Sequence, residues 1–169
     1  MKNLVIAVSL LLIGLPAYAQ DLPKDLNFEP VATLTGKGKG ESGFELVFGK
    51  VEIRLNGIAA PDNDDDEGHE GPGGKESAAH LASILADGPM VTCYLNGELA
   101  GGEPVAACYI PAKSGGGMED LARLQVASGH AVDCPRYSGG IYADAEAAAK
   151  KAGHDMSAIY KLPAHCIKK

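Results

Sequence analysis

Apolar and polar residues alternate over several short stretches in the first two thirds of the chain. Val51, Ile53 and Leu55 alternate with Glu52 and Arg54, and this period of two is typical of a half-buried β-strand. Short apolar runs of similar length recur before and after it. The expected strands are 31–35, 44–48, 51–55, 90–95 and 105–110.

Three other stretches are typical of helices. Ala78, Leu81, Ile84 and Leu85 recur at the spacing of one helix face, so a helix begins near Lys75. Two further helices are expected over 118–128 and 142–152, each followed by a glycine. The order of strands and helices therefore predicts an α+β fold, a five-stranded barrel of the OB type with three helices packed on it.

The first 19 residues have the pattern of a signal peptide. A basic start precedes an apolar stretch over 4–15, and Ala17 and Ala19 form an A-x-A cleavage site. The alternative is an uncleaved anchor helix, but the apolar stretch is too short to span a bilayer core of about 30 Å comfortably. We expect cleavage after Ala19, a secreted or periplasmic location, and no stable membrane anchor afterwards. The mature chain would be an extended segment over 20–30 and one domain over 31–169.

Four cysteines remain in the mature chain, and an even number in an exported protein favours two disulfides. Their spacing fits no zinc pattern; the alternative is free buried thiols. Cys93 and Cys108 lie on successive expected strands, so we predict that they face each other and pair. The second predicted pair, Cys134–Cys166, brackets the last helix and would attach the C-terminal tail to the barrel.

The charge of the chain and the motifs that it lacks exclude several classes of function. The chain has 15 basic and 22 acidic residues, with a net charge of −7, and it has no cluster of four or more basic residues. Nucleic acid is therefore a disfavoured partner, because a protein that binds phosphates usually carries a basic face. No G-x-S-x-G, H-E-x-x-H, P-loop or dinucleotide-binding motif is present, and the five histidines are scattered without metal-binding spacing. The partner is not indicated by the sequence.

Residues 51–62, Val-Glu-Ile-Arg-Leu-Asn-Gly-Ile-Ala-Ala-Pro-Asp, resemble the signature I-R-L-x-G-I-D-A-P-E of staphylococcal nuclease-like (thermonuclease-family) domains. Four further segments resemble the family in the same order along the chain. They are 43–46, 102–106, 128–131 and 136–146. The resemblance covers roughly 31–166 and implies the same OB-type barrel, together with calcium-dependent hydrolysis of phosphodiesters.

The resemblance also implies roles for individual positions. Arg54 stands where the family clamps a phosphate, and Asp62 where it has its catalytic glutamate. Phe44 and Ala59 stand at the two calcium-binding aspartates, and Glu103 at the second arginine. Hydrocarbon side chains cannot coordinate a hard cation, so no metal is expected at Phe44 and Ala59 and no cofactor is expected. Arg54 and Asp62 are thus the residual catalytic positions; the alternative, which we favour, is a surface ion pair between them.

The segment 62–70 is strongly acidic and resembles the front of an EF-hand loop. Its candidate calcium ligands are Asp64, Asp66 and Glu67. The twelfth position is a glycine, Gly73 or Gly74 according to where the count begins, whereas an EF-hand needs a bidentate glutamate there. We favour a solvated loop, with calcium binding as the alternative.

Three functions follow from these observations. The leading interpretation is a secreted or periplasmic, catalytically degenerate nuclease-like domain that acts as a binding or structural module. The alternative is a calcium-dependent nuclease with weak or altered activity. The third is a small calcium-binding or envelope-associated module that acts through 62–70.

Overall fold

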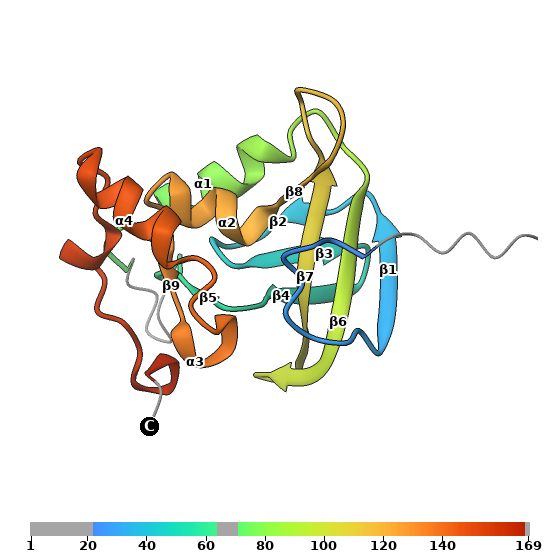
Figure 1. Cartoon of the computed structure of the whole chain (residues 1–169), viewed down its shortest axis with the longest axis horizontal. Coiled ribbons are helices and arrows are strands. Elements are labelled where there is room, and N and C mark those ends of the chain that lie inside the picture. The colour runs from blue at the N-terminus through green and yellow to red at the C-terminus, as the bar shows by residue number, and fades with distance from the viewer. Residues whose placement is uncertain (1–21, 64–70, 168–169) are drawn as a thin grey trace, which may run out of the picture.

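The computed structural model describes residues 22–63 and 71–167, so the predicted signal peptide lies outside the described residues. Most of its strands form one curved sheet, and helices α1, α2 and α4 gather at one side of it (Figure 1). The strands are β1 Ala32–Gly36, β2 Lys39–Gly40, β3 Glu45–Phe48, β4 Val51–Leu55, β5 Ile58–Ala59, β6 Val91–Ala100, β7 Glu103–Pro111, β8 Met118–Asp120 and β9 Val132–Asp133. The helices are α1 Gly74–Ile84, α2 Leu121–Ala127, α3 Pro135–Ser138 and α4 Ala143–Lys151, and two 3₁₀ turns follow at Met156–Ala158 and Ala164–Cys166.

The main sheet has seven strands in the order β1-β6-β7-β4-β3-β2, with β8 added to β7. All its pairings are antiparallel except that of β4 with β7. β1 and β2 occupy the two ends of this order although only Lys37 and Gly38 separate them in the chain. The sheet therefore curls so that its two ends come near each other, but no strand pairing between described residues closes it into a barrel.

The mixed α+β organisation is confirmed, whereas the numbers of elements differ from the prediction. The five expected strands and three expected helices are all present, all but the strand Val51–Leu55 with shifted bounds, and short elements accompany them. The start of the helix expected over 118–128 is instead β8, because Met118 pairs with Pro111 and Asp120 with Tyr109. The additional helix α3 is a single turn between Pro135 and Gly139, too short for apolar periodicity to reveal.

The hydrophobic core lies between the sheet and helices α1 and α2. Leu46 and Ile53 come from the sheet, and Leu81 and Leu121 come from the helices; all four side chains are fully buried. Gln125 of α2 carries a polar side chain that is also fully buried in this layer. Its Nε2 donates to the carbonyl oxygens of Gly43 (2.7 Å) and Ser77 (3.1 Å), so the amide connects both helices to the segment before β3.

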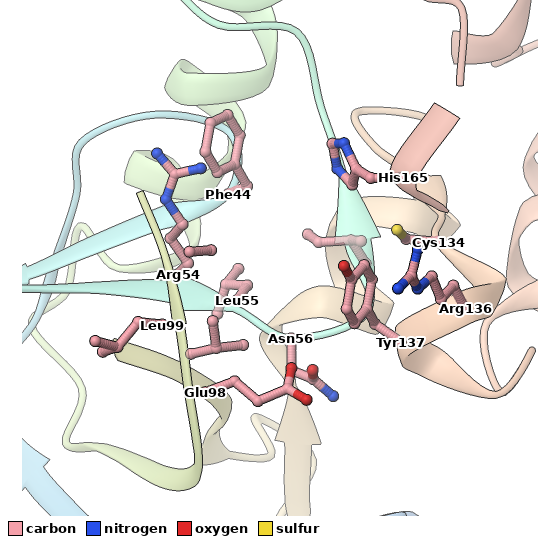
Figure 2. Close-up of a pocket in the computed structure, with 14 residues that line it drawn as sticks. Phe44, Arg54, Leu55, Asn56, Glu98, Leu99, Cys134, Arg136, Tyr137 and His165 are labelled. Atoms are coloured by element: carbon pink, nitrogen blue, oxygen red, sulfur yellow. The ribbon is translucent and has the colours of Figure 1, made fainter. Parts of the chain in front are cut away.

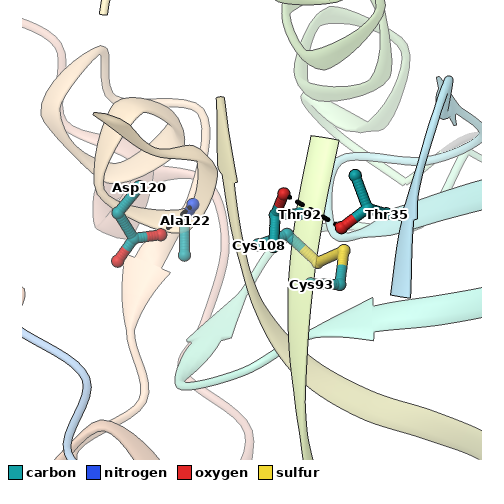
Figure 3. Close-up of a disulfide and its surroundings, with 6 residues drawn as sticks. All are labelled: Thr35, Thr92, Cys93, Cys108, Asp120 and Ala122. Carbon is teal, nitrogen blue, oxygen red and sulfur yellow. Dashed lines mark hydrogen bonds between the residues drawn. A yellow bond between two sulfur atoms is a disulfide. The ribbon is translucent and has the colours of Figure 1, made fainter. Parts of the chain in front are cut away.

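Both predicted disulfides are present. Cys93 and Cys108 are directly opposite in the β6–β7 register, and Figure 3 shows their bond crossing between the strands. Cys134 pairs with Cys166 and joins the start of α3 to the C-terminal tail. In the chain-entropy model the two closed loops, 15 and 32 residues long, stabilise the fold by about 3 and 4 kcal/mol. The disulfides are compatible with a location outside the reducing cytoplasm. None of the helices in the described parts of the chain has the length and apolarity needed to cross a membrane.

Asp120 is a buried carboxyl at the junction of β8 and α2. Its Oδ1 accepts a hydrogen bond from the Ala122 N–H (2.8 Å), which caps α2, as Figure 3 shows. Its Oδ2 accepts from the Tyr142 hydroxyl (2.7 Å). Burial raises the pKa of Asp120 to about 6, although both hydrogen bonds act in the opposite direction.

This raised pKa makes a testable contribution to stability. Because the folded protein holds the Asp120 proton more tightly than the unfolded chain, the contribution is complete below about pH 4 and is lost as the pH rises through about 6. The variant Asp120→Asn keeps an N-cap residue but cannot titrate. Between about pH 4 and pH 7, we expect the free energy of unfolding of the wild type to fall by up to about 3 kcal/mol relative to this variant.

Urea unfolding at both pH values measures the difference. A matched control is Asp155→Asn, which changes an exposed cap of the first 3₁₀ turn and should follow the wild type across this range. The prediction would be contradicted if the free energies of unfolding of the wild type and of Asp120→Asn differed by the same amount at both pH values.

Candidate functional site

A pocket of about 510 Å³ opens between the end of β4, the β6–β7 hairpin and α3. Figure 2 shows Phe44 and Arg54 on one side of it and Tyr137 and His165 on the other. A smaller pocket of about 100 Å³ shares Phe44, Arg54, Ile58 and His165 and continues towards Ala59 and Tyr160. We call the two adjoining pockets together the Arg54 cleft.

The charge of Arg54 is balanced inside the cleft. Glu45 is directly opposite Arg54 in the β3–β4 register, and its Oε1 lies 2.8 Å from the Arg54 Nη2. Glu103, at the start of β7, accepts a hydrogen bond from the Arg54 Nε at 2.5 Å. The guanidinium also lies over the Phe44 ring, 5.1 Å from its centre, as Figure 2 shows. Arg54 therefore forms ion pairs with two carboxylates and a cation–π contact with one aromatic ring. These contacts neutralise its charge and leave few of its N–H groups free for a phosphate.

The two carboxyls respond differently to this arrangement. Burial raises the pKa of Glu45, and hydrogen bonding from Ser42 and the charge of Arg54 limit the rise. The hydrogen bond from Arg54 lowers the pKa of Glu103. Both effects are physically consistent with one shared cation, because Glu45 is the more buried of the two acids.

The structure brings together four of the five positions that the family resemblance singles out. Phe44, Arg54 and Ala59 line the cleft, and Glu103 contacts Arg54. Asp62 does not line either pocket; it is exposed, and its Oδ1 accepts from the Asn63 N–H. The predicted ion pair between Arg54 and Asp62 is therefore wrong, because the strand register gives Arg54 two nearer carboxylates.

The described residues offer little to a metal ion in the cleft. Phe44 and Ala59 present hydrocarbon at the two positions implied for calcium ligands. Cys134, His165 and Cys166 come close enough to share an ion, but both sulfurs are bonded to each other. The candidate calcium ligands Asp64, Asp66 and Glu67 lie outside the described residues.

The far wall of the cleft was missed by the sequence interpretation. Arg136 and Tyr137 come from α3, and His165 comes from the C-terminal tail. The guanidinium of Arg136 lies 5.6 Å from the centre of the Tyr137 ring and has no ion pair among the residues that the structure describes. The Tyr137 and His165 rings are 6.4 Å apart. The predicted Cys134–Cys166 bond was the available signal, because it brings residue 165 next to residues 136 and 137.

Two apolar side chains remain accessible at the cleft. Leu99 is 69% exposed and Tyr137 is 39% exposed, and both line the larger pocket. A volume of about 510 Å³ lies within the usual range of small-molecule sites. Accessible apolar side chains beside the Arg136 guanidinium, which has no carboxylate partner in the described part of the chain, suit a ligand that has both an apolar part and a negative group.

A scan against models of known protein families finds no match for this chain, and a search of curated proteins finds none either. The geometry of the cleft is therefore the basis for a functional proposal.

A double-mutant cycle can measure how strongly Arg54 and Glu103 depend on each other. Replacing Arg54 by Met leaves Glu45 and Glu103 without their shared cation, so the additional change Glu103→Gln should recover part of the lost stability. We expect a coupling of about 1–2 kcal/mol in the free energy of unfolding, a value reduced for the partial exposure of both side chains.

The exposed pair Arg123–Asp144 provides the control, since its carboxyl side chain is 74% exposed. Arg123→Met with Asp144→Asn should show a smaller coupling in the same urea unfolding measurement. Equal couplings in the two cycles would mean that Arg54 is an ordinary surface cation.

Proposed function

We propose that this chain is an exported binding domain on a staphylococcal nuclease-like, OB-type barrel scaffold, and that it lacks nuclease catalysis. The observation that carries the proposal is the neutralised Arg54. The residue in the position of the family's phosphate clamp has a carboxylate oxygen at 2.8 Å and another at 2.5 Å.

The scaffold part of the proposal is supported by topology. β1 and β2 are nearly continuous in the chain and yet occupy the two ends of the sheet order, as expected for an OB-type barrel opened at one seam. Phe44, Arg54 and Ala59 lie on or beside three different strands and still line one cleft. This convergence is what the family resemblance implies for a clamp and two calcium-binding positions.

The proposed absence of catalysis is supported by electrostatics. Phosphodiester hydrolysis needs positive charge from metal or arginine where negative charge develops in the transition state. Here Phe44 and Ala59 supply no ligand oxygens, and Glu103 adds a negative charge beside Arg54. The net charge of −7 of the whole chain also opposes the approach of a polyanion. The alternative of a weak calcium-dependent nuclease has no observation among the described residues in its favour.

Digestion of single-stranded DNA and RNA with millimolar calcium tests the missing activity. We expect the wild type to release no more product than Arg54→Ala, because Arg54 is already occupied by Glu45 and Glu103. Calcium-dependent cleavage by the wild type that disappears in Arg54→Ala would overturn the proposal and support the nuclease alternative.

The binding role is proposed for the far wall of the Arg54 cleft. A ligand would place an aromatic or aliphatic part against Tyr137 and Leu99 and a carboxylate beside Arg136. The ligand class is thus a small apolar carboxylate, or a short chain segment that presents one.

A panel of small aromatic carboxylates and their uncharged amides can test this role by protein-observed NMR titration. We expect the carboxylates to bind more tightly than the amides, and we expect Arg136→Gln to remove that difference. Tyr137→Ala should weaken both series, whereas Lys50→Gln, in the turn between β3 and β4, should behave as the wild type. Binding that is unchanged in Tyr137→Ala, or no binding of any compound, would contradict the proposed role.

A further inference from the structure

His80 and His130 form a stacked pair that is separate from the Arg54 cleft. His80 lies on α1, His130 follows α2, and both residues are partly buried. Their ring centres are 4.2 Å apart and their planes are within 1° of parallel. Neither side chain lines either pocket of the cleft.

The buried Gln125 fixes the tautomer of His80. The Gln125 Nε2 faces two carbonyl oxygens, of Gly43 and Ser77, which can only accept hydrogen bonds. The amide oxygen of Gln125 is therefore the atom that faces His80, and it can only accept as well. The His80 Nδ1 must carry a proton, and in the neutral ring the Nε2 has a free lone pair.

Ser128 has the same effect on His130. Its single hydroxyl proton is directed to the carbonyl oxygens of Leu124 (2.8 Å) and Gln125 (3.0 Å) at the end of α2. The Ser128 oxygen therefore accepts from the His130 Nδ1 at 3.0 Å, and it also lies 3.3 Å from the His80 Nδ1. Both Nδ1 atoms are donors towards the protein, which leaves both Nε2 lone pairs available.

This arrangement is the one that proteins use to prepare histidine for a metal ion. A metal-binding imidazole usually donates its other N–H to a protein acceptor, which fixes the tautomer and orients the ring. Here each of the two rings in contact donates from its Nδ1 to a protein acceptor. Ring stacking alone would not require these two hydrogen bonds. Glu76 lies one turn before His80 on the same face of α1 and offers a carboxylate.

We propose that the Nε2 atoms of His80 and His130 bind a divalent transition-metal ion of the zinc type, with Glu76 as a third ligand. Imidazole nitrogen suits zinc, copper and nickel, whereas calcium and magnesium prefer oxygen. Binding requires the two rings to tilt out of parallel so that their lone pairs converge. Both rings belong to residues that are only partly buried, and this partial exposure leaves room for the tilt. The proposal is independent of the function of the Arg54 cleft.

Isothermal titration of the purified protein with zinc chloride, in a non-chelating buffer, tests the site. We expect His80→Asn and His130→Asn each to weaken zinc affinity by about tenfold or more. His165→Asn removes a histidine outside the pair and should retain the wild-type affinity. The same titration with calcium or magnesium should give no heat that depends on His80 or His130.

A thermal unfolding curve of each variant without metal shows whether it is folded. His80 is partly exposed on a helix, so the zinc affinity of His80→Asn decides between the outcomes if His130→Asn is unstable. No zinc binding by the wild type would overturn the proposal, as would an affinity unchanged in His80→Asn or lowered equally in His165→Asn.

Discussion

The cleft depends on one cation held between acids from two neighbouring strands. Arg54 on β4 lies between β3 and β7, and each of these strands contributes a carboxylate to it. Without the guanidinium, Glu45 and Glu103 would face each other in a partly buried space, at a cost that the sheet would have to offset. The same contacts that join the three strands also neutralise the charge of Arg54 inside the cleft. Structural support and the binding of an anion are therefore competing uses of this one side chain.

A second polar centre connects the helices to the sheet. Gln125 is fully buried, yet each of its amide atoms has a partner, which is the condition under which a buried polar group does not destabilise a core. Because its partners come from α1 and from the segment before β3, the amide also fixes how α1 sits on the sheet. The stacked histidines lie at the outer end of this network. Their orientation is therefore determined by the core and not by the surface alone.

Much of the fold could be predicted from local pattern. The alternation over Val51–Leu55 predicts a strand with the correct bounds, and the Cys93–Cys108 disulfide follows from cysteines on two strands that the pattern predicts. The Cys134–Cys166 disulfide follows from two cysteines that bracket the last predicted helix. The predictions that failed concerned which side chains contact each other. The predicted surface ion pair between Arg54 and Asp62 is wrong because strand pairing brings Glu45 and Glu103 nearer to Arg54 in space. The register of the β3–β4 hairpin would have revealed Glu45; Glu103 depends on the parallel pairing of β4 with β7, which no local pattern encodes.

The contact between His80 and His130 could not be predicted from local pattern either. His80 and His130 are 50 positions apart and have no motif between them, so only the packing of α1 against α2 reveals that they touch. The number and spacing of histidines in the chain therefore say nothing about this pair. Its geometry depends on Gln125, a residue that periodicity would assign to an ordinary helix position.

The Cys134–Cys166 bond has a consequence for the cleft as well as for stability. It joins the helix that carries Arg136 and Tyr137 to the tail that carries His165, so one covalent bond assembles a whole wall of the larger pocket. A chain in which these two sulfurs are reduced could retain the sheet and its core, because neither sulfur belongs to the main core cluster. Such a chain would retain the Arg54 side of the cleft and lose the wall formed by α3 and the C-terminal tail. The oxidation state of the compartment in which the protein matures thus decides whether the surface proposed for binding exists at all.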